Sequence, residues 1–527
     1  MVVTSTSQES LVSLRDIMQR AKVRAQPDGT KHFLPSGELH RICTRENVLN
    51  ELKKEFHHDA ANSFTRWIFD DFESGSKSDP QALAVFGILV MSGDLNKLVR
   101  FVENSITDAN LPLVWDGETL LTQNGCILND LRQPGCCFMD DEDRFQAEFY
   151  REQWEILPPV LSKADMKQDD WPAFHSHAIL PWTYMESKRK SMFSDVYKVR
   201  IHKNNHASSE HEHEEFALKI LKSDDATDFE FKQELYALKK VSSEPHVLEL
   251  HAAFKHGDRP CLLFKWAQGG SLSELMEMNP YELRLSGTQL YEWIVLQMTG
   301  LAEGLCGMHD AHDDLSRWCI DGKEDFYGIH GDVKPDNILR FTDRDPAGRL
   351  VLSDFGLTRF HTKASRSHRR GNGPVSPTYA SPEHNDYICG VSRRSDVWAL
   401  GCVYTEMLTW AIQGPEAHKL YECARLSEDD VGRQKGTWHM DRFFGIDFSE
   451  RDLSGALGRR FLKKAVIDFI QTNKDMADRL GPQGVRINEI LDFVGHEMLD
   501  VDYTRRATCD KVYRFLVSVR EKMVVED

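Results

Sequence analysis

The sequence has no hydrophobic run long enough to cross a bilayer, no paired cysteine motif and no N-terminal leader pattern. Its longest apolar run, residues 82–91, is too short and too mixed for a membrane span, so we expect no membrane insertion. Eleven cysteines form an odd set without Cys-x-x-Cys spacing, which favours reduced thiols. Residues 1–7 are polar and lack the basic and apolar regions of a signal peptide. These absences together favour an intracellular protein, in the cytoplasm, the nucleus or both.

Positive charge is scarce, because 65 Lys and Arg residues stand against 83 Asp and Glu residues and the net charge is −18. This balance argues against a nucleic-acid partner for the chain as a whole. The hydrophobic content of 41% is typical of globular domains, and 527 residues are too many for one of them. We therefore expect two or three domains.

The first third of the chain shows helical periodicity but no clustered ionisable residues. Apolar residues recur at three- and four-residue spacing in residues 10–23, in the segment after the capping residue Thr44, and in residues 80–91. No group of His, Cys or carboxylate residues there has metal-ligand spacing. We predict an α-helical N-terminal domain, residues 1–172, that offers a partner-binding or regulatory surface rather than catalysis. Three tryptophans are expected to pack in its core or against the next domain: Trp115, Trp154 and Trp171.

The stretch 329–337 combines a base, a phosphate-binding cation and a metal ligand. Asp332 can accept a proton from an attacking hydroxyl group, and Lys334 can reach a transferring phosphoryl group. Asn337 has the spacing to hold a magnesium ion, and Asp354 offers a second metal-binding side chain shortly afterwards. Phosphoryl transfer needs positioning and positive charge more than covalent chemistry. This set of residues therefore predicts phosphoryl transfer.

The run His-Gly-Asp-Val-Lys-Pro-Asp-Asn, followed by Asp-Phe-Gly, resembles the catalytic motifs of eukaryotic-type Ser/Thr protein kinases. The resemblance implies an α+β, bilobal kinase domain over residues 173–523. Its small, β-rich lobe would cover about 173–267 and its large, helical lobe about 268–523. The resemblance also implies ATP and Mg²⁺ as cofactors and Ser or Thr residues of protein substrates as acceptors. The longer pattern is similar to kinase-domain proteins of filamentous fungi that carry a helical N-terminal region.

The family's glycine-rich loop over the nucleotide phosphates corresponds to residues 189–196, where all three glycines are replaced. Arg189, Ser191 and Ser194 stand in their places, whereas Val196 fits the family pattern. Glycine at these positions lets the backbone approach phosphate and adopt positive φ angles. The serine hydroxyl groups can donate to phosphate instead, but we expect weaker ATP binding.

Other segments of the small lobe are similar to the family's nucleotide site. Residues 216–219 resemble the strand whose lysine contacts the α- and β-phosphates, and Glu234 has the place of that lysine's partner. The strand 261–267 carries the gatekeeper Phe264 and ends in a hinge whose backbone groups would bind the adenine edge. The resemblance thus assigns these nucleotide-binding residues: Lys219, Glu234, Ser191, Ser194, Val196, Ala217, Phe264, Lys265, Ala267 and Leu339.

The large lobe is similar to the family at its structural anchors. Asp396 is expected to hold the catalytic loop through backbone N–H groups, and Arg506 is expected to pair with Glu383. Ser376 has the position of the threonine that bonds the catalytic Asp and Lys in Ser/Thr kinases. Gly331 replaces the arginine that many of these kinases carry before the catalytic Asp. We therefore expect activity without phosphorylation of the activation segment.

Three interpretations of function stay open on the sequence. The retained ionisable groups favour an active Ser/Thr protein kinase. The lost glycines favour a pseudokinase that acts as a nucleotide-binding scaffold. A small-molecule kinase fits less well, because Ser376 and residues 381–383 would build a platform for a protein substrate.

A His-rich stretch in the small lobe also has two interpretations. Histidine side chains at metal-ligand spacing can hold a metal ion, but on a strand-edge hairpin they are more often solvated. We favour solvated side chains for its four histidines, which are His202, His206, His211 and His213.

Overall fold

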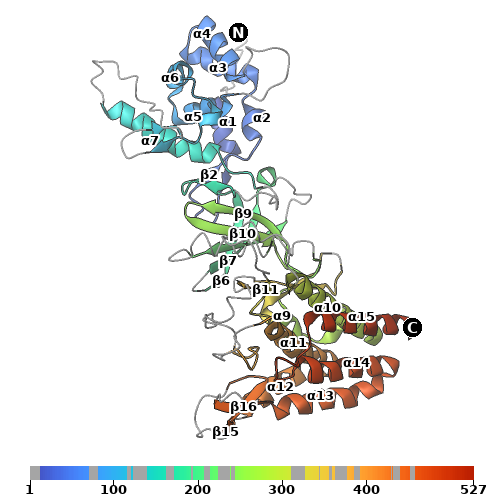
Figure 1. Ribbon diagram of the computed structural model, residues 1–527. Helices are drawn as coiled ribbons and strands as arrows, with labels where there is room; N and C mark the ends of the chain where they lie inside the picture. Colours follow the sequence, from blue (N-terminus) through green and yellow to red (C-terminus); the bar gives the residue numbers. More distant parts are fainter. Residues whose placement is uncertain are drawn as a thin grey trace, which may run out of the picture. The chain divides into compact units, whose positions relative to one another are not determined.

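The structure is a computed structural model in which two compact units are formed, one by residues 1–224 with 251–265 and the other by residues 225–250 with 266–527 (Figure 1). None of the described helices is both long enough and apolar enough to cross a membrane. The residues that the structure describes are 12–69, 81–115, 120–122, 139–161, 171–191, 194–206, 214–222, 235, 238, 244–309, 327–343, 345–354, 359–361, 377–384, 392–428, 430, 440–451 and 457–526.

The first unit begins with a helical module, in which the helices expected from periodicity are confirmed. Thr44 caps its helix by accepting a hydrogen bond from the backbone N–H of Asn47 at 3.3 Å. Helix α5 is buried at every residue, because its sequence is apolar on all sides. The helices are α1 (Leu14–Ala21), α2 (Glu38–Ile42), α3 (Arg45–Glu55), α4 (His58–Ile68), α5 (Leu83–Ser92), α6 (Leu98–Glu103) and α7 (Met139–Ile156), and the short strands are β1 (Val23–Arg24), β2 (His32–Phe33), β3 (Val114–Trp115) and β4 (Leu120–Leu121).

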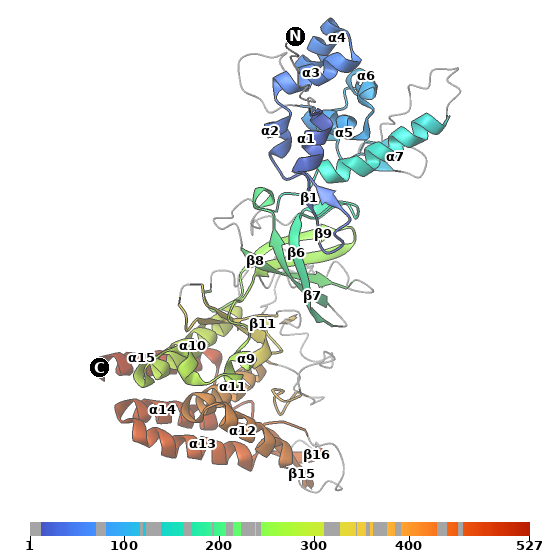
Figure 2. The same ribbon diagram turned by 180° about the vertical axis from the view of Figure 1, so that it is seen from behind.

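A six-stranded sheet completes the first unit (Figure 2). Its strand order is β5-β9-β10-β8-β7-β6. Its antiparallel pairs include β6 with β7, β7 with β8 and β8 with β10. One face is apolar and carries Val199, Phe216, Leu218 and Leu263 into a hydrophobic core. The strands are β5 (Ala173–Phe174), β6 (Trp182–Lys190), β7 (Ser194–Ile201), β8 (Glu215–Leu221), β9 (Leu250–His256) and β10 (Arg259–Lys265).

The helical module packs directly on the strands of this sheet. The backbone N–H of Gln26 donates to the carbonyl of Trp182 at 2.9 Å. The indole ring of Trp154 stacks on His175, with ring centroids 4.7 Å apart and an interplanar angle of 14°. Trp154 also packs in a small cluster with Ile179, as expected for a tryptophan that meets the next domain. The boundary near residue 172 stays a prediction, but the two segments share one packed interface.

The expectation of solvated histidines is wrong for His206. Its side chain is 6% exposed and lies against Phe216, with its Nε2 atom 2.6 Å from the Nε2 atom of His251. The backbone of His206 also forms a parallel bridge with Leu161, which tethers the helical module to the sheet. The sequence pattern could not show this, because the partner ring comes from a distant strand. His211 and His213 lie outside the described residues.

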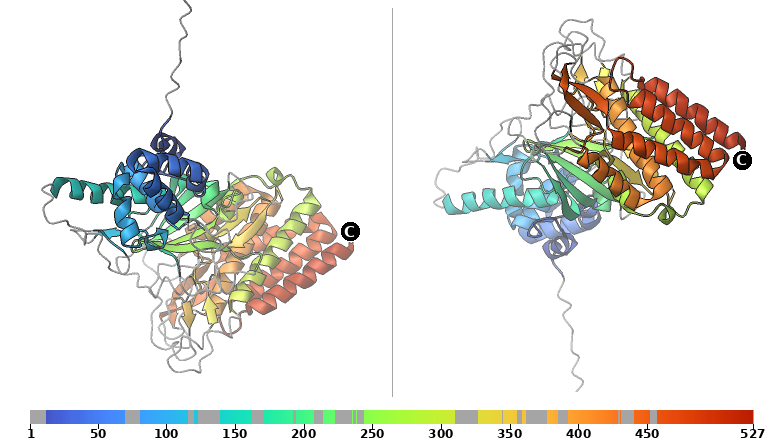
Figure 3. Two further views of the ribbon diagram at one scale, coloured as in Figure 1. Left: turned by 90° about the horizontal axis from the view of Figure 1, so that it is seen from above. Right: turned by 90° about the horizontal axis from the view of Figure 1, so that it is seen from below.

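Helices dominate the second unit, and α11 forms its centre. This helix is buried along most of its length, including the large side chains of Trp398 and Trp410. Helices α10 and α15 lie side by side, where the Tyr513 hydroxyl donates to Glu303 at 2.9 Å (Figure 3). The helices are α9 (Leu272–Glu277), α10 (Gly287–His309), α11 (Arg393–Gln413), α12 (Pro415–Ser427), α13 (Lys464–Ala477), α14 (Pro482–Phe493) and α15 (Cys509–Glu526).

Three antiparallel two-stranded sheets lie in the same unit. The pair β12–β13 follows the catalytic motif in the sequence. In the pair β11–β14, strand β11 precedes this motif and strand β14 follows it. The pair β15–β16 is a hairpin in the long segment between α12 and α13. The strands are β11 (Tyr327–Ile329), β12 (Ile338–Phe341), β13 (Arg349–Leu352), β14 (Arg359–His361), β15 (Phe444–Arg451) and β16 (Leu457–Leu462).

Candidate active site

Asp396, at the start of α11, holds the backbone of the catalytic loop. Its carboxylate accepts hydrogen bonds from the backbone N–H groups of His330 and Gly331, both at 2.9 Å. The Nε2 atom of His309 lies 2.9 Å from the same carboxylate, which is buried. The expected anchoring role of Asp396 is therefore confirmed. Gly331 has a φ angle of 80°, a conformation that residues with a Cβ atom rarely adopt.

The anchored loop brings the predicted base, cation and metal ligand together. The Nζ atom of Lys334 lies 2.6 Å from Oδ2 of Asp332. The Nδ2 atom of Asn337 donates to the same Oδ2 atom at 2.9 Å and to the Asp332 carbonyl at 2.9 Å. Asp332 is 9% exposed and lines a small pocket together with Tyr379. The carboxylate is thus fixed by two donors, in a residue that borders this small pocket.

Strand register brings Asn337 and Asp354 to the same end of the β12–β13 pair. Asn337 comes immediately before β12, and the backbone N–H of Ser353, immediately after β13, donates to its carbonyl at 2.8 Å. Asp354 is the next residue and has a φ angle of 63°. Because the Asn337 amide nitrogen is used by Asp332, its amide oxygen is left as a possible ligand. Two oxygen-bearing side chains next to each other fit a magnesium ion that also binds phosphate.

No group of three or more His, Cys, Asp or Glu residues that could hold a metal ion occurs among the described residues. A magnesium ion held by Asn337 and Asp354 would thus take its other ligands from phosphate and water, as this ion commonly does. The side chains present fit such an ion but not a metal enclosed by protein ligands.

The nucleotide-binding residues expected in the small lobe share one face of its sheet. Val196 on β7 is directly opposite Lys219 on β8, and Ala217 on β8 is opposite Phe264 on β10. Directly opposed residues of antiparallel strands project from the same face, and residues two apart in one strand do so too. This face is opposite to the one that carries Phe216 into the core. Strand register therefore places four of the expected residues on one face of the sheet, although they come from three different strands.

The tip of the β6–β7 hairpin is closed by its two serines. Ser191 Oγ donates to the carbonyl of Ser194 at 2.8 Å and accepts from the Ser194 backbone N–H at 3.0 Å. Lys222 adds a hydrogen bond to the Ser191 carbonyl at 2.7 Å. The Ser191 hydroxyl therefore serves the turn itself, whereas the sequence had suggested it as a donor to phosphate.

The remaining expected site residues do not belong to this group on the sheet face. Lys265 ends β10 in the first unit, and its Nζ atom pairs with Glu214 at 3.0 Å. Ala267 lies in the second unit as a buried residue, and Leu339 is half-buried on β12. Glu234 and Ser376 lie outside the described residues, so their assignments stay predictions.

A buried ion pair supports the end of the activation segment. Nη1 and Nη2 of Arg506 donate to the two oxygens of Glu383 at 2.7 and 2.9 Å, as the resemblance predicted. The Ser395 hydroxyl donates to the same carboxylate at 3.1 Å. Burial alone would raise the pKa of Glu383, but the hydrogen bonds and charge of Arg506 hold it below its usual value.

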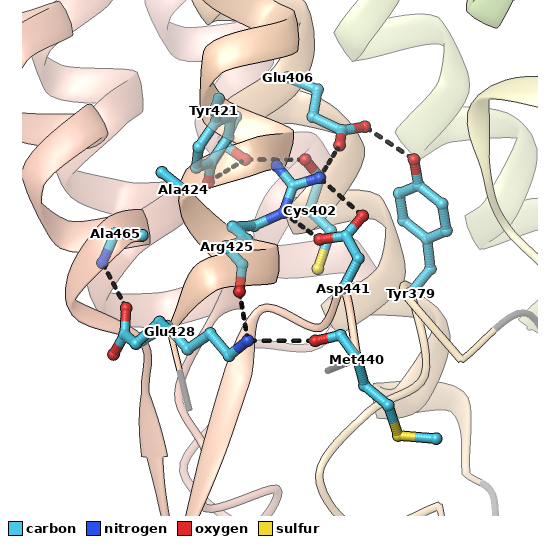
Figure 4. Close-up of polar contacts among 12 residues, drawn as sticks. Tyr379, Cys402, Glu406, Tyr421, Ala424, Arg425, Glu428, Met440, Asp441 and Ala465 are labelled. Carbon is cyan, nitrogen blue, oxygen red and sulfur yellow. Dashed lines mark hydrogen bonds and ion pairs between the residues drawn. The ribbon is translucent and has the colours of Figure 1, made fainter. Parts of the chain in front are cut away.

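A second buried network was not predicted from the sequence. The Tyr379 hydroxyl donates to Glu406 on α11 at 2.9 Å, and Nη2 of Arg425 on α12 donates to the other Glu406 oxygen at 2.8 Å (Figure 4). Nε of Arg425 donates to Asp441 at 2.9 Å. Burial raises the pKa of Glu406 to about 7, although the Arg425 charge lowers it. The network links α12 to Tyr379, which lines the pocket beside the catalytic loop.

Aromatic rings hold the Arg425 guanidinium group in place. Its carbon atom lies 4.3 Å from the ring centroid of Tyr421 and 4.2 Å from that of Phe443. Such contacts favour a buried cation. A single acidic residue, Glu406, within the otherwise apolar stretch of α11 was the available sequence signal, but nothing in the sequence named its partner.

The comparisons with known proteins agree with this site. The chain matches the protein kinase domain model over residues 202–514, which is more than half of its length. It is 30% identical over 195 residues to the probable inactive receptor kinase RLK902 of Arabidopsis thaliana, which covers 37% of this chain and 26% of that protein. The match begins after β7, so the segment with the replaced glycines lies before it.

Two yeast kinases are similar as well. The MAP kinase kinase kinase wis4 of Schizosaccharomyces pombe is 24% identical over 299 residues, which is 53% of this chain and 19% of that protein. The serine/threonine-protein kinase SSK22 of Saccharomyces cerevisiae is 27% identical over 273 residues, which is 48% of this chain and 17% of that protein. The chain thus spans only 17–26% of the length of these three relatives. The catalytic loop, its anchors and the matched family model lead to one conclusion: the chain belongs to the protein kinase domain family.

Proposed function

We propose that the chain transfers the γ-phosphoryl group of ATP to Ser or Thr residues of protein substrates, with Mg²⁺ as cofactor. The observation that carries this proposal is the buried Asp332 carboxylate, whose Oδ2 atom is held by both Lys334 and Asn337. A carboxylate in this setting can accept the proton of an attacking hydroxyl group. Lys334, which is next to it, supplies positive charge for the transferring phosphoryl group.

The other residues of the proposed site have supporting roles. Asn337 and Asp354 would hold Mg²⁺ against the phosphate oxygens, and Lys219 would bind the α- and β-phosphates. Ser376 would bond Asp332 and Lys334, and Glu234 would orient Lys219. Lys334 indicates Ser or Thr rather than Tyr as the acceptor by family resemblance. The helical N-terminal module, residues 1–172, would bind a partner or regulate the kinase domain, and the similarity to fungal kinase-domain proteins stays a prediction.

A specific observation favours a second candidate, a pseudokinase that binds nucleotide as a scaffold. The hairpin that should cover the phosphates has lost its glycines, and its tip is closed by Ser191 and Ser194. A curated relative is itself named a probable inactive receptor kinase. The retained Asp332, Asn337 and Asp354 support the active enzyme more strongly, because these side chains perform the chemistry.

Transfer of radiolabelled phosphate from ATP tests the proposal on generic protein substrates and on the chain itself. Mg²⁺-dependent labelling is expected for the wild type. Asp332→Asn is expected to reduce the rate by about 10²-fold or more, because it removes the proton acceptor. Asp336→Asn is a matched control, since Asp336 is an exposed carboxylate in the same loop and should leave the rate unchanged. No labelling by the wild type, together with measurable nucleotide binding, would favour the scaffold.

A further inference from the structure

Arg189 lies in one cross-strand row with Lys219. Strand β6 places Arg189 directly opposite Val196 on β7, and Val196 is directly opposite Lys219 on β8. Opposed residues of antiparallel strands project from the same face of a sheet. Arg189 therefore shares the face of Lys219, which is the face opposite to the apolar core under Phe216 and Leu218. The strand order of the sheet places β8, β7 and β6 next to one another in this order.

The spacing in this row suits a polyphosphate. Neighbouring strands are about 4.8 Å apart, so the backbones of Arg189 and Lys219 are separated by about 10 Å across β7. Two long cationic side chains can converge from that separation on one phosphate chain. A guanidinium group also binds phosphate with two parallel hydrogen bonds, which a lysine cannot do.

Arg189 is not used elsewhere in the described part of the chain. Its side chain is exposed, and it has no hydrogen bond, ion pair or ring contact with any described residue. Two nearby cations differ, because Lys188 pairs with Glu186 at 2.7 Å and Lys222 pairs with Asp195 at 2.8 Å, whereas Lys190 is exposed like Arg189. An exposed arginine without a partner is common on protein surfaces, but this one is in register with the expected phosphate-binding lysine.

At the two described ends of the hairpin loop, the backbone N–H groups of Ser191 and Ser194 are not free for the usual phosphate contacts. In the family, glycines let backbone N–H groups approach the phosphates. Here the backbone N–H of Ser194 donates to Ser191 Oγ, and the N–H of Ser191 donates to the Ser194 carbonyl. These two donors are therefore committed to the turn, and a cationic side chain on the same hairpin can attract the phosphates in their place.

We propose that Arg189 binds the nucleotide phosphates together with Lys219, so that side-chain charge replaces the backbone contacts of a glycine-rich loop. This inference rests on the proposed kinase function, because it assigns a role at the same nucleotide site. The inference assigns a role to Arg189 but none to the adjacent cation Lys190. Lys190 is opposite Asp195, one position along the strand, and projects from the other face. Only Arg189 should contribute to phosphate binding.

Equilibrium binding of ATP with Mg²⁺, and of adenosine, measured by calorimetry on the full chain, tests the inference. Arg189→Gln is expected to weaken ATP binding about tenfold, as for one lost charge-assisted contact, and to leave adenosine binding unchanged. Lys190→Gln, the matched control from the other face, should leave both affinities unchanged. Arg189→Lys should have an ATP affinity between those of the wild type and Arg189→Gln, since the charge is retained but the two parallel hydrogen bonds are lost.

The possible results separate this inference from the proposed function. If Arg189→Gln binds ATP as tightly as the wild type, or if Lys190→Gln loses as much affinity, the role of Arg189 is wrong and the kinase proposal stands. Tighter ATP binding by Arg189→Gln would show that Arg189 obstructs the nucleotide and would also overturn the inference. If the wild type binds neither ATP nor adenosine, the proposed function and the inference are both wrong.

Discussion

Arg506 donates two hydrogen bonds to Glu383 across a separation of 123 residues, and both side chains are almost completely buried. The pair ties the loop before α15 to the end of the activation segment. Arg506 also donates to the carbonyls of Arg394 and Asp500, at 2.8 and 2.9 Å. A buried charge of this kind is stable only while its partner is present.

The first prediction concerns the loss of one partner of this pair. Arg506→Met is expected to lower the free energy of unfolding of the second unit by about 3–5 kcal/mol, because Glu383 is left as an uncompensated buried charge. Urea denaturation followed by tryptophan fluorescence measures this change. The double variant Arg506→Met with Glu383→Met should lose less than the sum of the two single variants. Additive losses would show that the two side chains are not coupled.

The second prediction is a pH dependence from the same pair. Because the folded-state pKa of Glu383 is below its usual value of 4.5, its ionised form stabilises the fold above about pH 4.5. That stabilisation is lost as the pH falls through the lower, folded-state pKa. The difference in unfolding free energy between wild type and Glu383→Gln should thus be largest near pH 7 and narrow below pH 4.5. A difference that stays constant down to pH 3 would contradict the pairing.

The third prediction concerns the link between the pocket and α11. Tyr379→Phe removes the hydrogen bond to Glu406, and the carboxylate oxygen that loses its donor is buried. We expect the variant to be less stable by about 1–3 kcal/mol. Thermal and urea unfolding measure the loss, with Tyr281→Phe as control, because Tyr281 is 73% exposed. Equal stability of the two variants would mean that the hydrogen bond contributes nothing to folding.

The fourth prediction follows from Gly331. Because Gly331 replaces the arginine before the catalytic Asp, position 331 carries no cation that requires a phosphate partner, so phosphatase treatment should leave activity unchanged. The combined replacement of four hydroxyl residues of the activation segment by Ala should also leave it unchanged: Thr358, Thr362, Ser365 and Ser367. These four lie outside the described residues. Loss of activity in both samples, restored in the wild type by an upstream kinase, would overturn the prediction.

The control for this prediction is the variant Gly331→Arg. Gly331 has a φ angle of 80°, which strains any residue with a Cβ atom. Gly331→Arg is therefore expected to lower stability rather than simply add a regulatory charge. A stable Gly331→Arg variant that becomes dependent on phosphorylation would show that the backbone tolerates the arginine and that the charge alone decides regulation.

Features that depend only on local order along the chain could be predicted before the structure was known. Apolar spacing predicted the helices α1 and α3, because one buried stripe per helix is a local property, and the continuous apolar run of α5 is equally local. The spacing of Asp332, Lys334 and Asn337 predicted a shared site, since a short loop cannot separate them widely.

Contacts between residues far apart in the sequence became known only from the folded structure. His251 buries His206, and Arg425 neutralises part of the charge on Glu406, although neither partner is signalled by spacing. Register across β6, β7 and β8 decided that Arg189 shares a face with Lys219. The physical reason is that periodicity fixes which face of an element is apolar but not which partner covers it. That choice depends on long-range packing and strand pairing, which no single segment contains.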